Sequence, residues 1–456
     1  MEAASKYSLS ADCCAITERN TACYDTVDTA SKSAIYWRVP LAELEPLLPD
    51  FDALRAPARL VISKAHDVGR HLHPATLDAI TELLRTINCY YSNLIEGHDT
   101  HPVNIERALA GELSRDPTTR DLQIEARAHI EVQRRMEARL ASESGLNVCS
   151  VEFLKWIHGE FYERLPDAYR LVRNPSSTRE ERVVPGELRR YDVRVGDHVA
   201  PTHPELEELL ARFAEAYDPA TMLREDGRVD RALAALAAAH HRLLWIHPFG
   251  DGNGRVTRLM TDAYLRRIGV GAHGLWTVSR GLARARDRYK QMLANADQPR
   301  WNDYDGRGQR SARALDEFCR FFLDVCADQV AYMSGLLAVD RLRERFSAYC
   351  RARASGLLAT PGAEPLASPP RRGRPQAAFR AEATRLLVAL FAQGPVRRED
   401  VEEITGLADR TARRMVSSLR DEGLIASASH RAPLFLRFPA HVAPYVFPGL
   451  YGDAIV

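Results

Sequence analysis

Apolar residues recur at helical spacing through most of the first three quarters of the chain, and this periodicity constrains the fold more than any other feature. It is clearest over residues 80–95 and 233–244, where apolar side chains follow an i, i+3, i+4, i+7 pattern. Each segment is expected to form an amphipathic helix that buries one face. Residues 173–204 differ, because Pro, Gly and Arg are dense there and a short alternating stretch predicts a small β-hairpin. The sequence thus predicts a mainly α fold.

A chain of 456 residues is expected to form two or three domains. Residues 1–35 have no period and predict an N-terminal arm. Residues 351–376 are rich in Pro and Gly and predict a linker, after which three helices and a hairpin predict a winged helix over 377–440. Residues 441–456 are expected to be a C-terminal tail. The elements expected in the winged helix are helices over 383–394, 398–406 and 409–423 and strands near 425–428 and 434–438.

Composition excludes several classes of protein. Lys and Arg number 62 against 61 Asp and Glu, so the whole-chain charge predicts neither a nucleic-acid partner nor a membrane surface. The eight cysteines form no C-x-x-C pair, the chain starts without an apolar signal segment, and no stretch approaches about 20 apolar residues. We therefore expect a cytoplasmic protein with no membrane partner.

The nine residues 247–255, HPFGDGNGR, join two helical patterns. Pro248 disfavours continuation of the first helix, and a second helix is expected to begin near Arg255. Arg255 and Arg258 then lie one turn apart beside a glycine-rich helix entrance. Free backbone N–H groups, the helix dipole and two guanidinium groups all favour an anion, so the loop predicts a polyphosphate site.

Three further residues of this loop suit chemistry on a phosphate. His247 can accept a proton at neutral pH, Asp251 can hold Mg²⁺, and Asn253 can donate to a phosphate oxygen. The loop is not a Walker loop, since no G-x-x-x-x-G-K-[ST] occurs. It is not a dinucleotide fingerprint either, because Arg255 replaces the last glycine of G-x-G-x-x-G.

The string over residues 247–255, with Arg258 three positions later, resembles the full Fic-family signature H-P-F-x-[DE]-G-N-G-R-x-x-R. The resemblance extends over roughly residues 60–335. It implies an all-α catalytic domain over 126–350 with a small β-hairpin flap, preceded by an N-terminal helical region over 36–125. It also implies transfer of AMP from ATP to a Tyr, Ser or Thr hydroxyl of a protein, with Mg²⁺ or Mn²⁺ and release of pyrophosphate.

The same resemblance implies roles for single residues. Those of the loop are His247 as general base, Asp251 as metal ligand, Gly252, Asn253 and Gly254 as the anion hole, and Arg255 and Arg258 as holders of the β- and γ-phosphates. Relatives that transfer phosphate carry lysine at the position of Gly254, so glycine favours AMP transfer. Those outside the loop are Arg189, Arg190 and Tyr191 in a target-docking flap over 185–195, and Tyr289 beside the adenosine.

The segment "SNLIEG" ends the first periodic helix and places Ser92 and Glu96 on one face, before Gly97. Taken alone, such a glutamate indicates only a solvated last turn. The segment also resembles the inhibitory motif [ST]-x-x-x-E-[GN] of the Fic family. This resemblance implies that Glu96 pairs with Arg258 and keeps it from the γ-phosphate. In some relatives the same glutamate supports removal of AMP, and the sequence leaves that second role open.

Residues 371–456 carry 13 arginines, no lysine and nine acids, a net charge near +4. Four of these arginines, on the third helix of the expected winged helix, suit phosphate contacts with DNA. Contact with the catalytic domain or dimerisation is the alternative, and it is favoured because the base-reading pattern is incomplete. The expected partners are ATP and a hydroxyl-bearing target protein, with self-modification and a homodimer also open.

Other functions remain open from the sequence. One is a transcription regulator whose Fic-like domain senses a nucleotide. Another is an enzyme that uses a different donor such as UTP, or one that removes AMP.

Overall fold

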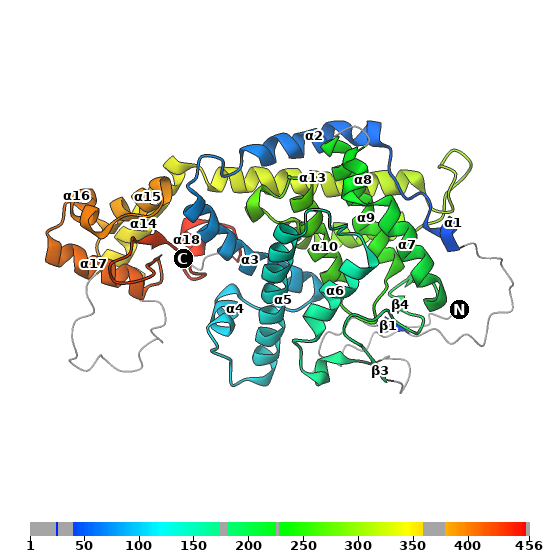
Figure 1. Cartoon of the computed structure of the whole chain (residues 1–456), viewed down its shortest axis with the longest axis horizontal. Coiled ribbons are helices and arrows are strands. Elements are labelled where there is room, and N and C mark those ends of the chain that lie inside the picture. The colour runs from blue at the N-terminus through cyan, green and yellow to red at the C-terminus, as the bar shows by residue number, and fades with distance from the viewer. Residues whose placement is uncertain (1–23, 26–39, 174–179, 225–227, 359–378, 453–456) are drawn as a thin grey trace, which may run out of the picture.

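The computed structural model describes residues 24–25, 40–173, 180–224, 228–358 and 379–452, and this part of the chain is mainly helical, as predicted (Figure 1). The predicted N-terminal arm lies outside the described residues, except for strand β1 (Tyr24–Asp25). The predicted linker lies outside them from residue 359 onward, and its first residues continue a helix that ends at Ala354.

The helices divide into three groups along the chain. The first group is α1 (Pro40–Leu44), α2 (Phe51–Asp67), α3 (Pro74–Glu96), α4 (Pro102–Leu109), α5 (Pro117–Ser142) and α6 (Val151–Tyr162). The second is α7 (Leu206–Ala216), α8 (Pro219–Arg224), α9 (Val229–Ile246), α10 (Asn253–Arg267), α11 (Val278–Arg284), α12 (Arg286–Ala296), α13 (Ala312–Leu336) and α14 (Val339–Ala354). The third is α15 (Ala383–Gln393), α16 (Val401–Thr405), α17 (Asp409–Asp421) and α18 (Ala443–Val446).

Helix α9 is the centre of the main helical body. Residues 232–239 are all buried, and six of these eight are alanine, which favours a helix and lets neighbouring helices approach closely. Helices α2, α10 and α13 pack around it, with α2 and α13 side by side along one edge (Figure 1). This packing fixes the C-terminal end of α9, where the HPFGDGNGR loop begins.

Helix α13 is long, but most of its apolar side chains face the core. Cys319 and Cys326 are among them, and both are buried free thiols, in agreement with a packing role. Within the described residues, no single helix combines the length and apolar composition needed to cross a membrane. Helices α13 and α14 satisfy these criteria only as a pair, which is bent by 62°.

The strands are short and lie near the loop. Strands β2 (Leu171–Arg173) and β3 (Glu180–Arg182) form one antiparallel hairpin, and β4 (Arg194–Val195) and β5 (His198–Val199) form another, to which β1 adds. The hairpins therefore flank the predicted flap of residues 185–195, most of which is irregular. The buried guanidinium of Arg189 donates to the carbonyl oxygens of Tyr191 and Pro201, so a side chain satisfies part of this irregular backbone.

The C-terminal unit, residues 379–452, follows the predicted order of elements. Helices α15, α16 and α17 precede a two-stranded hairpin of β6 (Ile425–Ala426) and β7 (Phe435–Leu436). Its core is the apolar face of α15 with the inner residues of α17 and of both strands. The assignment of this unit as a winged helix stays a prediction.

The C-terminal unit packs against α3 and α4 (Figure 1). Thr76 of α3 lies with its hydroxyl 3.2 Å from the carbonyl oxygen of Leu390 and 3.1 Å from that of Phe391. The amide of Ala440 donates to the Glu106 carboxyl of α4 over 2.7 Å. Residues 441–452, expected as a tail, include α18 and bury Val442, Ala443, Val446, Phe447, Leu450 and Tyr451.

The Glu106 contact predicts a pH dependence of stability. Burial raises the pKa of Glu106 from 4.5 to about 7, although the Ala440 amide and Arg437 oppose this shift. The folded state thus binds the proton more tightly than the unfolded chain, so stability falls as the pH rises from 4.5 to 7. Glu106→Gln should remove this fall and raise the free energy of unfolding at pH 8 by on the order of 2 kcal/mol. Denaturant titrations from pH 4.5 to 8 measure it.

Glu112→Gln is the control, since Glu112 is an exposed acid near the same helix. It should keep the wild-type slope. Parallel curves for wild type and Glu106→Gln would contradict the assignment.

Candidate active site

The HPFGDGNGR loop turns sharply between α9 and α10. His247 caps α9 in the left-handed conformation, with φ 50° and ψ 61°, which is uncommon for a residue other than glycine. Gly252 precedes α10 with φ 81°, a conformation that glycine adopts without strain. The loop therefore leads directly into the N-terminus of α10, where unpaired backbone N–H groups can meet an anion.

Asn253 closes this loop from within. Its Oδ1 accepts from the Phe249 amide over 2.9 Å, and its Nδ2 donates to the Phe249 carbonyl oxygen over 2.8 Å. The Phe249 ring is fully buried and stacks on His158 with centroids 4.1 Å apart. Asn253, predicted to donate to a phosphate, thus uses both ends of its amide to fix the loop.

His247 is buried, with 7% of the residue exposed. Burial first, and then the neighbouring His198 and Arg189, lower its pKa to about 3. The imidazole is therefore neutral at pH 7, which is the form of histidine that can accept a proton. Its carbonyl oxygen accepts from Arg189 Nε over 2.8 Å, which fixes the backbone on which the ring stands.

Asp251 lies on the opposite side of the loop, next to Tyr162 of α6. The Tyr162 hydroxyl donates to Asp251 Oδ2 over 2.6 Å, and Arg255 Nη2 lies 3.1 Å from the same oxygen. Burial alone raises the pKa of Asp251, but Arg255 and Tyr162 bring it below its usual value, so the carboxylate is charged.

A single charged carboxylate fits a metal that arrives with a nucleotide. Mg²⁺ is commonly bound by one or two carboxylates together with substrate phosphates. Among the described residues no group of three His, Cys, Asp or Glu side chains is placed to hold a metal. The role of Asp251 as a ligand of Mg²⁺ or Mn²⁺ stays a prediction.

Arg255 is held by a residue that the sequence analysis did not single out. Its Nη1 pairs with the carboxylate of Glu125 from α5, and only 5% of the Glu125 side chain is exposed. Glu125 Oε2 also lies 2.8 Å from His98 Nδ1, two residues beyond Glu96. The available signal was an acid on the apolar face of α5, where the buried residues Ala128, His129, Val132 and Met136 follow it at helical spacing.

Arg258 meets the residues of the predicted inhibitory motif. Its Nη2 lies 2.5 Å from Glu96 Oε1, and its Nε donates to the Ser92 hydroxyl over 2.9 Å. Gly97 ends α3 in the left-handed conformation, with φ 92°. The pair of Glu96 and Arg258 that the resemblance implied is therefore present, and Ser92, placed on the same face of α3 by the sequence, is a second partner.

Gly254 provides the space for this contact. A Cβ atom at Gly254 would collide with Glu96 Oε1 and lie 3.0 Å from Arg258 Nη1. The carboxylate of Glu96 therefore lies directly over the first turn of α10, beside the anion site. A phosphate bound to Arg258 at this place would compete with Glu96.

The predicted flap residues occupy different environments. Arg189 is 4% exposed and binds loop carbonyls, so its guanidinium lies inside the protein. Arg190 is exposed, and the Tyr191 hydroxyl lies over Gly250. Tyr289 is 3% exposed, and its hydroxyl lies 2.7 Å from His240 Nε2 beneath α10. The roles predicted for these residues in target docking and adenosine binding stay predictions.

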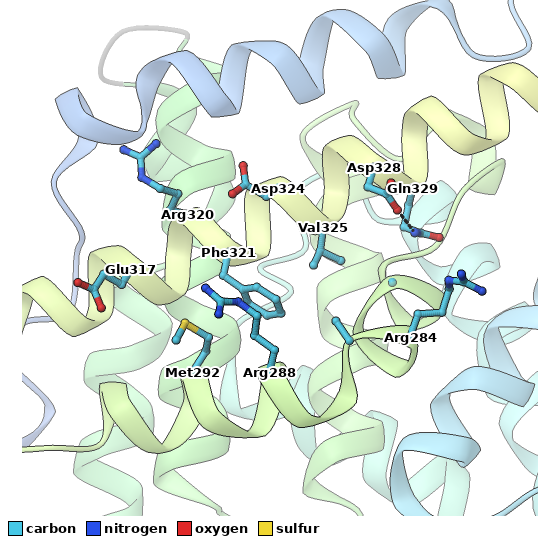
Figure 2. Close-up of a pocket in the computed structure, with 12 residues that line it drawn as sticks. Arg284, Arg288, Met292, Glu317, Arg320, Phe321, Asp324, Val325, Asp328 and Gln329 are labelled. Carbon is cyan, nitrogen blue, oxygen red and sulfur yellow. Dashed lines mark hydrogen bonds between the residues drawn. The ribbon is translucent and has the colours of Figure 1, made fainter.

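A cavity of about 530 Å³ lies away from the loop, between the α11–α12 segment and α13. Figure 2 shows Arg284, Arg288 and Met292 pointing toward it from one side and Phe321 and Val325 from the other. None of its lining residues belongs to the loop of residues 247–258. This cavity is therefore separate from the candidate active site.

Comparison with known proteins agrees with this site. Residues 148–265 match the Fic/DOC family. A protein adenylyltransferase Fic of Nematostella vectensis is 37% identical over 84 residues, and one of Culex quinquefasciatus is 39% identical over 84 residues. The aligned parts cover 18% of this chain and 18% and 16% of these relatives, so the chain matches less than a fifth of their length.

Two solved structures of Fic proteins align with this chain. A Fic family protein from Desulfovibrio desulfuricans G20 aligns with a TM-score of 0.44 and 18% identity, over 86% of this chain and 96% of that chain. Fic-1 from C. elegans aligns with a TM-score of 0.46 and 16% identity, over 62% and 72%. The family match includes the whole HPFGDGNGR loop, Arg255 and Arg258. Residues 148–265, which contain the candidate site, are therefore similar to the Fic/DOC family.

Proposed function

We propose that this chain is a protein adenylyltransferase that transfers AMP from ATP to a Tyr, Ser or Thr hydroxyl of a target protein or of itself. The proposal rests on one observation. A single loop brings together a neutral His247, a charged Asp251 and the N-terminus of α10 with Arg258. Relatives named protein adenylyltransferase support the type of reaction. Gly254 supports it further, because relatives that transfer phosphate carry lysine there.

The residues of the site suit an in-line displacement at the α-phosphorus of ATP. The substrate hydroxyl oxygen forms a bond to that phosphorus while the bond to the β-bridging oxygen breaks, and pyrophosphate leaves. The hydroxyl proton passes to the neutral ring of His247. Backbone N–H groups at the start of α10 and Arg258 bind the phosphates and stabilise the charge that develops. Mg²⁺ or Mn²⁺ at Asp251 would neutralise phosphate charge when bound.

The contact between Glu96 and Arg258 supports autoinhibition. Arg258 is buried, and its guanidinium is already shared by Glu96 and Ser92. The Glu96 carboxylate neutralises the guanidinium charge of Arg258 and occupies one of its donors. Arg258 therefore binds a γ-phosphate less strongly while this pair is intact. ATP would then bind without the grip that aligns its α-phosphate, and transfer would be slow until Glu96 moves away.

We propose that the main role of the C-terminal unit is contact with protein rather than with DNA. Its packing on α3 and α4 supports this choice, since it joins the unit to the main body. The arginines of α17 are exposed, so a DNA contact on that face would be compatible with this packing. They are Arg410, Arg413, Arg414 and Arg420.

Glu96→Gly is expected to raise self-labelling from α-labelled ATP by at least about fivefold, because it frees Arg258 for the γ-phosphate. His247→Ala in the same background should abolish the labelling. Mass spectrometry of the intact protein after incubation with ATP and Mg²⁺ should detect an AMP-sized adduct on a hydroxyl residue.

Asp99→Asn is the control, because it removes the charge of an exposed acid three residues from Glu96 without adding a glycine to the turn. It should leave labelling at the wild-type rate. A phosphate-sized adduct, an adduct formed only with UTP, or no adduct in any variant would overturn adenylyl transfer. Loss of a preformed AMP adduct, faster in wild type than in Glu96→Gly, would indicate the reverse reaction.

Glu125 is expected to orient Arg255 for the triphosphate. In the Glu96→Gly background, Glu125→Gln should raise the KM for ATP about tenfold with a smaller change in kcat, because the guanidinium loses its charged partner. Glu137→Gln is the matched control, since Glu137 lies on the same helix and pairs with Arg85 and Arg266 away from the loop. Initial rates at varied ATP measure both. An equal KM in the two variants would contradict the role of Glu125.

A further inference from the structure

The last described residues of the chain lie beside the turn that carries Glu96. We name residues 446–451 the C-terminal strut. These residues form no β-strand. Their carbonyl oxygens accept hydrogen bonds from side chains of the main body. The donors are Arg345 to Val446 over 2.7 Å, Tyr332 to Pro448 over 2.9 Å, Arg280 to Gly449 over 2.6 Å, and Tyr91 to Leu450 over 3.0 Å.

Such a set of donors indicates a specific seat. Carbonyl groups at or beyond the end of a helix need other partners, and here four of them accept from side chains of distant elements, although Pro448 and Gly449 are exposed residues. Arg280 is itself fixed, because its Nη1 donates to Gln329 over 2.9 Å and its guanidinium lies 3.8 Å from the centre of the Tyr332 ring. The strut is therefore held in one place relative to α11 and α13.

The strut reaches the turn between α3 and α4 through Tyr451. This side chain is 3% exposed, and its ring lies 5.3 Å from that of His101 and 6.3 Å from that of Tyr90. The Tyr451 hydroxyl donates to the carbonyl oxygen of Ala440, whose amide binds Glu106 of α4. Tyr451 thus contacts both sides of the turn that contains Glu96.

Glu96 depends on this turn for its position. It is the last residue of α3, and the turn is closed by the Gly97 amide to Leu94 and the His98 amide to Asn93. Tyr91, which holds the strut, lies only five residues before Glu96 on the same helix. A shift of α3 by one ångström at Tyr91 would be transmitted to Glu96, because a helix segment of this length is rigid.

We propose that the C-terminal strut positions Glu96, so that an undisturbed C-terminal unit keeps Glu96 on Arg258 and displacement of the strut releases it. The inference rests on the proposed function, because it assigns the regulation of that same site. Tyr451 acts as a positioning residue and touches neither nucleotide nor target. A change in the position of the C-terminal unit then affects the active site through the packed side chain of Tyr451.

Tyr451→Ala in the full chain tests the proposal, with Tyr349→Phe as the control. Tyr349 is also 3% exposed and also holds the C-terminal unit, through Glu422, and its ring packs on Tyr445 of α18. The Phe variant removes only the hydrogen bond to Glu422 and keeps this ring in place. Hydrogen exchange of the Gly97 and His98 amides is the first measurement. It should become roughly 3- to 10-fold faster in Tyr451→Ala, the range expected for loss of an aromatic contact, and stay unchanged in Tyr349→Phe.

Self-labelling from α-labelled ATP is the second measurement. Tyr451→Ala should raise it by a similar roughly 3- to 10-fold, and in the Glu96→Gly background the same change should add nothing, because the brake is already absent. Tyr91→Phe removes only the hydrogen bond to Leu450 and should act in the same direction with a smaller effect. This variant keeps the test valid if Tyr451→Ala does not fold.

The outcomes separate the two proposals. If Glu96→Gly gives no AMP adduct, the proposed reaction fails, while exchange at Gly97 and His98 still tests the strut. If Glu96→Gly is active but Tyr451→Ala and Tyr91→Phe match Tyr349→Phe in exchange and labelling, the strut has no positioning role. An additive gain of Tyr451→Ala in the Glu96→Gly background would also overturn it.

Discussion

Two guanidinium groups are buried on the first turns of α10, and the need to pair them organises the surrounding helices. A buried charge is tolerated only with a partner, and α10 supplies few acids of its own. Asp251 serves Arg255 from within the loop, but the remaining partners, Glu125 and Glu96, come from α5 and α3. The N-terminal helices thus pack where they do partly because they complete the charge balance of the site. In the proposed reaction, Glu96 competes with the triphosphate for Arg258, and Glu125 orients Arg255 toward it.

Helix α3 connects three parts of the molecule that are far apart in sequence. Its start meets α15 of the C-terminal unit, and its last turns meet both the strut and Arg258. Glu96, with 29% of its side chain exposed, can leave Arg258 by a side-chain rotation. The proposed role of the strut adds a movement of the backbone, which can be influenced from the C-terminal unit.

The sequence predicted the features that depend on local pattern. The periodicity of α3 and α9, the break at Pro248 and the shared face of Ser92 and Glu96 were all visible, and the Glu96 contact with Arg258 is present as expected. Features that depend on distant partners were not visible. Glu125 lies 130 residues from Arg255 in the sequence. Arg189 stands in a polar, loop-like stretch of sequence, although its guanidinium binds the carbonyl oxygens of Ile246, His247 and Pro201. The burial of residues 441–452 likewise needs a surface that no local pattern reveals.

The bonds between Asn253 and the backbone of Phe249 make the catalytic loop a small closed ring with its own rigidity. The Phe249 anchor and this ring hold the loop from one side, and Arg189 holds the backbone of His247 from the other. If the loop transfers AMP as proposed, the base would keep its alignment while residues at the entrance change with the acceptor.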